Sequence, residues 1–96
     1  MIQRHEREMS ISHQDFYRLL PIALKNIDYE ISNDNQINLS YAGGKLQIAP
    51  GNEHKRKIAS LELPVLLVVF TFVDIPEDDI SLFFTNFSRT YQRGGG

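Results

Sequence analysis

The chain has 96 residues and a formal net charge of −2, with 42% hydrophobic and 23% charged residues. These values fit a single small globular domain with a modest core, and they exclude a disordered or fibrous chain. Cysteine is absent, so disulfides, thiolate catalysis and sulfur-ligated metal are excluded, and a cytoplasmic location is expected.

The first ten residues mix charged side chains with few apolar ones. We therefore expect residues 1–10 to be a flexible lead-in to a single domain over residues 11–93. Ser12 is a good N-cap, and apolar residues follow at helical spacing up to Ile27. This pattern predicts a helix over about residues 13–26, kinked at Pro21.

Short extended runs separated by turn residues come next. Apolar residues alternate with polar ones over residues 29–31, 37–41 and 45–48. The pair Gly43-Gly44 predicts the hairpin turn between the second and third runs. A loop is expected over residues 50–52, followed by a fourth extended piece over residues 58–62.

The run from Leu63 to Asp74 is rich in β-branched and aromatic residues and is too short for most helices, which favours a strand. Alternation places one apolar set on one face, namely Val65, Leu67, Val69 and Val73. The other face carries Leu66, Val68, Phe70 and Phe72. Because both faces are apolar, both need a cover, from helices or from a second copy of the chain. The second set is the expected interface with a second copy or with another protein.

The last predicted element is a helix that starts at Pro76. Acidic residues 77–79 suit the positive end of its dipole, and apolar residues recur at helical spacing from Ile80 to Tyr91. Residues 94–96 form a glycine tail. The expected fold class is α+β: an N-terminal helix, an antiparallel β-meander of four to five strands and a C-terminal helix, in a two-layer sandwich. One helix on each face of the sheet is the competing arrangement.

No catalytic or metal constellation stands out. Ser12, His13 and Asp15 lie too close together on one turn to imitate a catalytic triad, so neither an enzyme nor a cofactor is expected. The histidines lack metal-ligand spacing. The order helix, meander, helix resembles frataxin-like proteins, which bind iron on acids of their first helix. Here that helix holds only Asp15, and no metal site is predicted.

Two alternatives accompany the main interpretation. The basic run Lys55, Arg56 and Lys57 is a candidate nucleic-acid contact, and Phe70-x-Phe72 resembles the base-stacking positions of RNA-recognition sheets. The glycine end resembles the tails of ubiquitin-like modifiers and sulfur carriers, which implies a carrier or modifier role. A secondary contact is expected at Arg89, Arg93, Gly94, Gly95 and Gly96.

Taken together, the sequence predicts a small non-catalytic protein-interaction or adaptor module that forms a homodimer. No apolar run reaches the roughly 20 residues of a membrane-spanning helix, so no membrane contact is expected.

Overall fold

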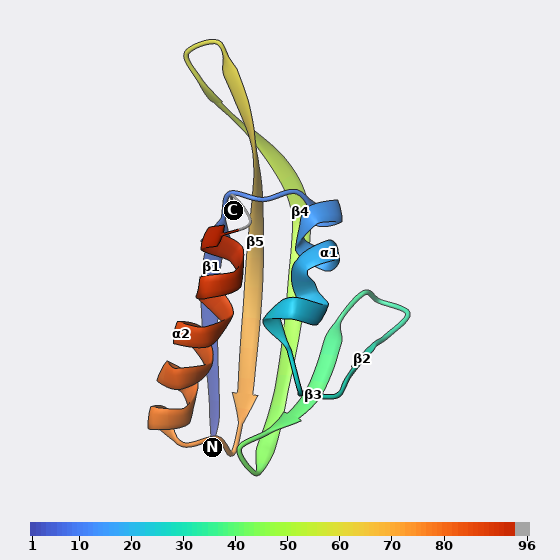
Figure 1. The fold of residues 1–96 in the computed structure, drawn as a ribbon, viewed down its shortest axis with the longest axis vertical. Coiled ribbons are helices and arrows are strands. Elements are labelled where there is room, and N and C mark those ends of the chain that lie inside the picture. Colours follow the sequence, from blue (N-terminus) through green and yellow to red (C-terminus); the bar gives the residue numbers. More distant parts are fainter. Residues whose placement is uncertain (94–96) are drawn as a thin grey trace.

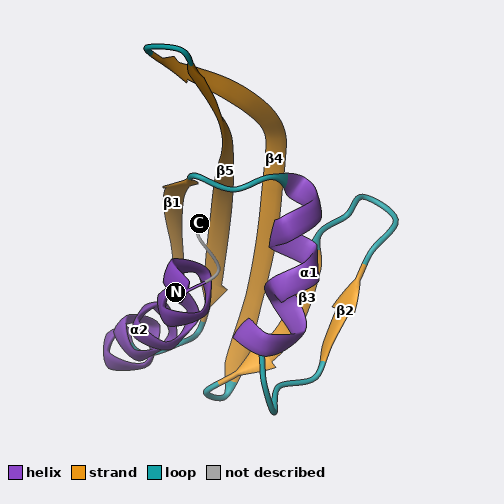
Figure 2. Ribbon diagram, turned by 45° about the horizontal axis from the view of Figure 1, so that its top comes forward, coloured by secondary structure: helices purple, strands orange, loops and turns teal. Residues whose placement is uncertain are grey.

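The computed structural model describes residues 1–93, which form a five-stranded antiparallel sheet with two helices on one of its faces (Figures 1 and 2). The elements are β1 (Ile2–Met9), α1 (His13–Ala23), β2 (Tyr29–Ile31), β3 (Ile37–Tyr41), β4 (Gly44–Ile58), β5 (Leu61–Val73) and α2 (Glu77–Arg93). Across the sheet the strands follow the order β1-β5-β4-β3-β2. The predicted α+β class is confirmed, with both helices on the same face.

The N-terminal segment is a strand and not the flexible lead-in predicted from its composition. It pairs antiparallel with residues Leu66–Val73 of β5 and forms one edge of the sheet. On its helix side the His5 ring packs edge-on against Phe84, and the Arg7 guanidinium lies 4.1 Å from the centroid of the same ring. Polar residues can form this strand because an aromatic ring of α2 packs against the His5 ring and the Arg7 guanidinium.

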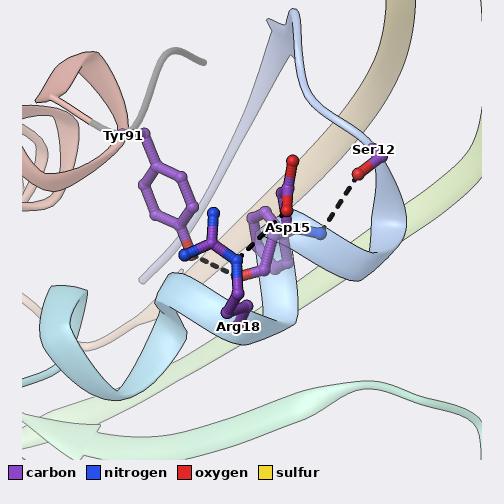
Figure 3. Close-up of polar contacts among 5 residues, drawn as sticks. Ser12, Asp15, Arg18 and Tyr91 are labelled. Atoms are coloured by element: carbon purple, nitrogen blue, oxygen red, sulfur yellow. Dashed lines mark hydrogen bonds and ion pairs between the residues drawn. The ribbon is translucent and has the colours of Figure 1, made fainter.

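Helix α1 begins and ends for local reasons. The Ser12 hydroxyl accepts a hydrogen bond from the Asp15 backbone N–H at 3.1 Å, as an N-cap should (Figure 3). Pro21 has no N–H to donate, and the helix ends at Ala23 instead of continuing to residue 26. Leu24, the C-cap, is nevertheless fully buried, so the apolar side of the helix extends past its last turn.

The turn between β3 and β4 lies one residue earlier than predicted. Ala42 and Gly43 form it, with φ angles of 50° and 82°, and positive φ at both central residues matches the twist of a hairpin. Gly44 instead opens β4 and pairs with Tyr41. A Cβ atom at Gly44 would lie 2.2 Å from the Val73 carbonyl oxygen, so this glycine is needed for close approach to β5.

Strand β4 continues through the loop predicted at residues 50–52. This segment is a bulge between Pro50 and Glu53, an irregularity that accommodates a proline within a strand. The chain reverses at Ala59 and Ser60, in the middle of the extended piece predicted over residues 58–62. Residues 53–65 project from the rest of the sheet as a two-stranded hairpin, which we call the arm (Figure 1).

The core lies between the helices and the sheet. Its fully buried large side chains include Phe16, Leu20, Leu24, Ile37, Leu46, Ile48, Leu66, Val68, Phe70, Phe72 and Ile75. The Tyr91 hydroxyl of α2 donates a hydrogen bond to the Phe16 carbonyl of α1 at 2.8 Å (Figure 3). Burial raises the pKa of this hydroxyl, and the neighbouring Tyr29 and Tyr17 raise it further. The contact joins the two helices directly.

Candidate interaction surfaces

The face of β5 predicted as an interface is buried in the core. Leu66, Val68, Phe70 and Phe72 are at most 1% exposed, so the prediction of an interface at these residues was wrong. The reason lies in α2, whose aromatic rings surround the β5 rings. The Phe70 ring, for example, packs edge-on against three rings of α2, those of Phe83, Phe84 and Phe87. Aromatic side chains have the largest area to bury, and the helices cover the face that carries them.

The opposite face of β5 has no helix on it. We call this side of the sheet the open face, and its row of β5 side chains the stripe: Leu61, Leu63, Val65, Leu67, Val69, Thr71 and Val73. Leu61 and Leu67 are 62% and 41% exposed. Only Thr71 in this row is polar. Alternation along the sequence predicted this second apolar face but not its extension to Leu61 and Leu63.

One ion pair crosses the stripe. Arg56 lies opposite Leu63 on β4, Glu8 lies opposite Leu67 on β1, and their side chains meet in a salt bridge. Val65 occupies the row between them, and it is only 7% exposed although it faces away from the helices. The pair therefore covers Val65 and divides the stripe in two.

The two sections differ in their surroundings. The arm section consists of Ile58, Leu61 and Leu63 on the projecting hairpin. The body section consists of Ile2, Ala49, Leu67, Val69 and Val73, because Ile2 and Ala49 lie directly opposite β5 residues of the stripe. Each apolar row of the body section spans at most two neighbouring strands, Ala49 with Val69 and Val73 with Ile2, which makes it about 10 Å wide at roughly 4.8 Å per strand. Along β5 it extends for about 20 Å.

Charged residues border the body section on both sides. On the β4 side, Lys45 lies opposite Val73. On the β1 side, Arg4 and Glu6 lie opposite Thr71 and Val69 and form an ion pair with each other at 3.5 Å. An apolar centre with a charged border is the pattern of a protein-binding surface.

The base of the arm is fixed to α1. The His13 backbone N–H donates to the Glu53 carboxylate at 2.8 Å, and the His13 Nε2 lies 2.7 Å from the Gly51 carbonyl oxygen. The hydrogen bond from the His13 N–H, with help from Lys55, holds the pKa of the Glu53 carboxyl below its usual range. These contacts connect the bulge of β4 to the first turn of the helix.

The basic run predicted as a nucleic-acid contact lies on the β4 half of the arm. Alternation puts Lys55 and Lys57 on one side of the hairpin and Arg56 on the other. Lys55 forms an ion pair with Glu53 at 3.4 Å, and Arg56 is paired with Glu8. The structure thus brings these charges to two different faces. Phe70 and Phe72 are buried and offer no ring for base stacking.

The predicted secondary contact is only partly described. Arg89 lies on the outer side of α2, in a groove between this helix and β1 that His5, Arg7, Phe84 and Ser88 also line. Arg93 is the last residue of α2. The three glycines lie outside the described residues.

Within residues 1–93 no group of three or more His, Asp or Glu side chains is placed to hold a metal ion. In the same range no helix is long and apolar enough to cross a membrane. Comparison with protein-family models, curated proteins and solved structures gave no match. A function must therefore be inferred from the fold and its surfaces.

Proposed function

We propose that this chain is a non-catalytic protein-interaction module that binds a helix of another protein on the open face of its sheet. The observation that carries the proposal is the body section, an apolar surface interrupted at Thr71 that no described element covers. Leaving such a surface in water is unfavourable by about 25 cal/mol per Å² of apolar area. A partner that buries about 200 Å² of it would gain roughly 5 kcal/mol before the costs of association.

The dimensions of the body section favour a helix as the occupant. A helix with side chains is about 10–12 Å across, close to the width of two strands. About 13 helical residues cover a length of 20 Å. The same strands already bind a helix on their other side, where α2 packs against β1 and β5 (Figure 2). A partner helix would complete a three-layer arrangement.

The charged border indicates the chemistry of that helix. Next to Lys45 it would carry acidic residues, and on the β1 side, where Glu6 and Glu8 outnumber Arg4, it would carry basic ones. The preferred partner is therefore an amphipathic helix with a narrow apolar face, acidic along one flank and basic along the other.

A synthetic peptide of about 14 residues tests the proposal. It carries Leu at helical spacing, Glu along one flank and Lys along the other, and its binding is followed by fluorescence anisotropy. We expect saturable binding that Leu67→Glu weakens at least tenfold. The matched control is Leu82→Glu, since Leu82 is 53% exposed on the outer side of α2. Absence of saturable binding, or equal loss in both variants, would contradict the proposal.

A further inference from the structure

Strand β1 has an outer edge that no other described strand pairs with. The Asp74 N–H donates to the Met1 carbonyl at 2.8 Å, so the Met1 carbonyl points toward β5. Backbone direction alternates along an antiparallel strand. The backbone groups of Gln3, His5 and Arg7 therefore also point toward β5. Those that point outward belong to Ile2, Arg4, Glu6 and Glu8.

We infer that this edge pairs antiparallel with β1 of a second copy, about a two-fold axis that passes between the two His5 residues. In this register Arg4 lies opposite Glu6 of the second copy, and Ile2 lies opposite Glu8. Each of these pairs exchanges two backbone hydrogen bonds. Every outward-facing backbone group of residues 2, 4, 6 and 8 then has a partner, and each Arg4 meets a carboxylate on the open face.

Neighbouring registers are worse for electrostatic and geometric reasons. A shift by two residues in one direction places Arg4 opposite Arg4 of the second copy, and in the other direction Glu6 opposite Glu6. Either shift also leaves some outward backbone groups without a partner. A shift by one residue would place helix-side residues opposite open-face residues, which the pleat of a continuous sheet does not allow.

The edge carries charged side chains, which often protect an edge strand against pairing, but it is neither short nor interrupted by a proline or a bulge. Strand β1 has eight residues, no proline and no lysine, and its pairing with β5 is regular throughout. When a second copy of the strand runs antiparallel to the first, Arg4 of each copy lies opposite Glu6 of the other. A second copy is therefore the occupant that this edge fits best.

The helix side leaves room for such a partner. The groove outside His5 and Arg7 is bounded on α2 by Ser81, Thr85 and Ser88, which follow one another at helical spacing. These side chains are short, whereas the long Arg89 and Gln92 side chains line the groove only at the C-terminal end of α2. Two α2 helices, one from each copy, can thus approach across the two-fold axis to the 8–10 Å at which helices pack.

The pairing leaves the apolar part of the open face uncovered, so both surfaces can be occupied at once, although Arg4 and Glu6 belong to the paired edge and also border the body section. The two five-stranded sheets would form one continuous sheet, with a body section on each half of its open face. One assembly would then present two equivalent binding surfaces.

A single cysteine tests the register, because the chain contains none. At the two-fold axis the His5 positions form a non-hydrogen-bonded pair, with Cα atoms about 4.5 Å apart. This distance suits a disulfide. We expect His5→Cys to form a disulfide-linked dimer under mild oxidation. Gln3→Cys is the matched control, since the two Gln3 positions lie about 13 Å apart in this register. No linkage through His5→Cys, or equal linkage in both variants, would overturn the pairing.

A charge exchange provides the second test and does not depend on His5. Arg4→Glu places two carboxylates opposite each other at two symmetric positions. We expect the dissociation constant of the dimer to rise at least tenfold. Combining Arg4→Glu with Glu6→Arg restores opposite charges and should return the dimer to wild-type strength. A monomeric wild-type protein, or a dimer that neither variant affects, would show that β1 does not pair with itself. Far-UV circular dichroism verifies that each variant is folded.

Discussion

Gly44 and Gly43 are adjacent in the sequence but have different structural roles. Gly43 has a positive φ and nothing within 4 Å of its missing Cβ, whereas a Cβ on Gly44 would collide with the carbonyl oxygens of Val73 and Asp74. We predict that Gly43→Ala lowers the free energy of unfolding by about 1 kcal/mol through backbone strain. Gly44→Ala should lower it by about 3 kcal/mol, because β5 must shift. Urea denaturation measures both, and equal losses would contradict the assignment.

Glu53 makes the attachment of the arm sensitive to acid. Its pKa lies below the usual 4.5 because the folded chain stabilises the carboxylate. This contribution is therefore fully present above the unfolded-state pKa and is lost as the pH falls through the lower, folded-state pKa. We expect the His13 amide resonance in NMR to titrate below pH 4.5.

The Glu53→Gln variant is the control for this titration. Its amide oxygen can still accept from the His13 N–H, but it cannot ionise. The resonance should therefore show no inflection in this pH range. An inflection of equal size in the variant would assign the titration to another group.

At the scale of the elements, one buried hydrogen bond joins α1 to α2. Tyr91→Phe removes the donor to the Phe16 carbonyl but keeps the ring, which stacks on Phe16 at a centroid distance of 5.2 Å. We expect the free energy of unfolding to fall by about 1 kcal/mol. Tyr17→Phe is the control, since its hydroxyl donates to the Asn35 carbonyl at an exposed site. A larger effect at Tyr17 would contradict this role of Tyr91.

Local sequence patterns were sufficient to predict α2, β2, β3 and most of β5. The periodicity of these segments reflects the face that each one buries. Strand β1 was missed because polar residues occupy both of its faces, and the contacts of His5 and Arg7 with Phe84 exist only in the tertiary structure. The limits of β4 were missed because a proline and a glycine usually end a strand, whereas here they form a bulge.

At the scale of the whole molecule, the sequence predicted two apolar faces on β5 but not which face the helices would cover. Apolar side chains recur at every second residue on both faces, so periodicity alone does not tell which face the helices cover. The choice depends on matching Phe70 and Phe72 to the rings of α2, which is a property of the tertiary structure. The available surface is consequently the row of Leu67 and Val69, not the one first expected.

The two proposals assign separate tasks to two surfaces. In this arrangement the β1 edge would join two copies, and the body section of each copy would bind a partner helix. Leu67→Glu should then leave the pairing intact, because Leu67 lies on β5, whereas the pairing uses the outward backbone groups of β1 and the side chains of Arg4 and Glu6.

Light scattering on the Leu67→Glu variant over a range of micromolar concentrations tests this separation most directly. We predict the same dimeric mass as for the wild-type chain, in a variant whose peptide binding by fluorescence anisotropy is at least tenfold weaker. A monomeric Leu67→Glu variant beside a dimeric wild type would contradict the separation. That result would mean that the open face is covered by a second copy of the chain and is not available to a partner helix.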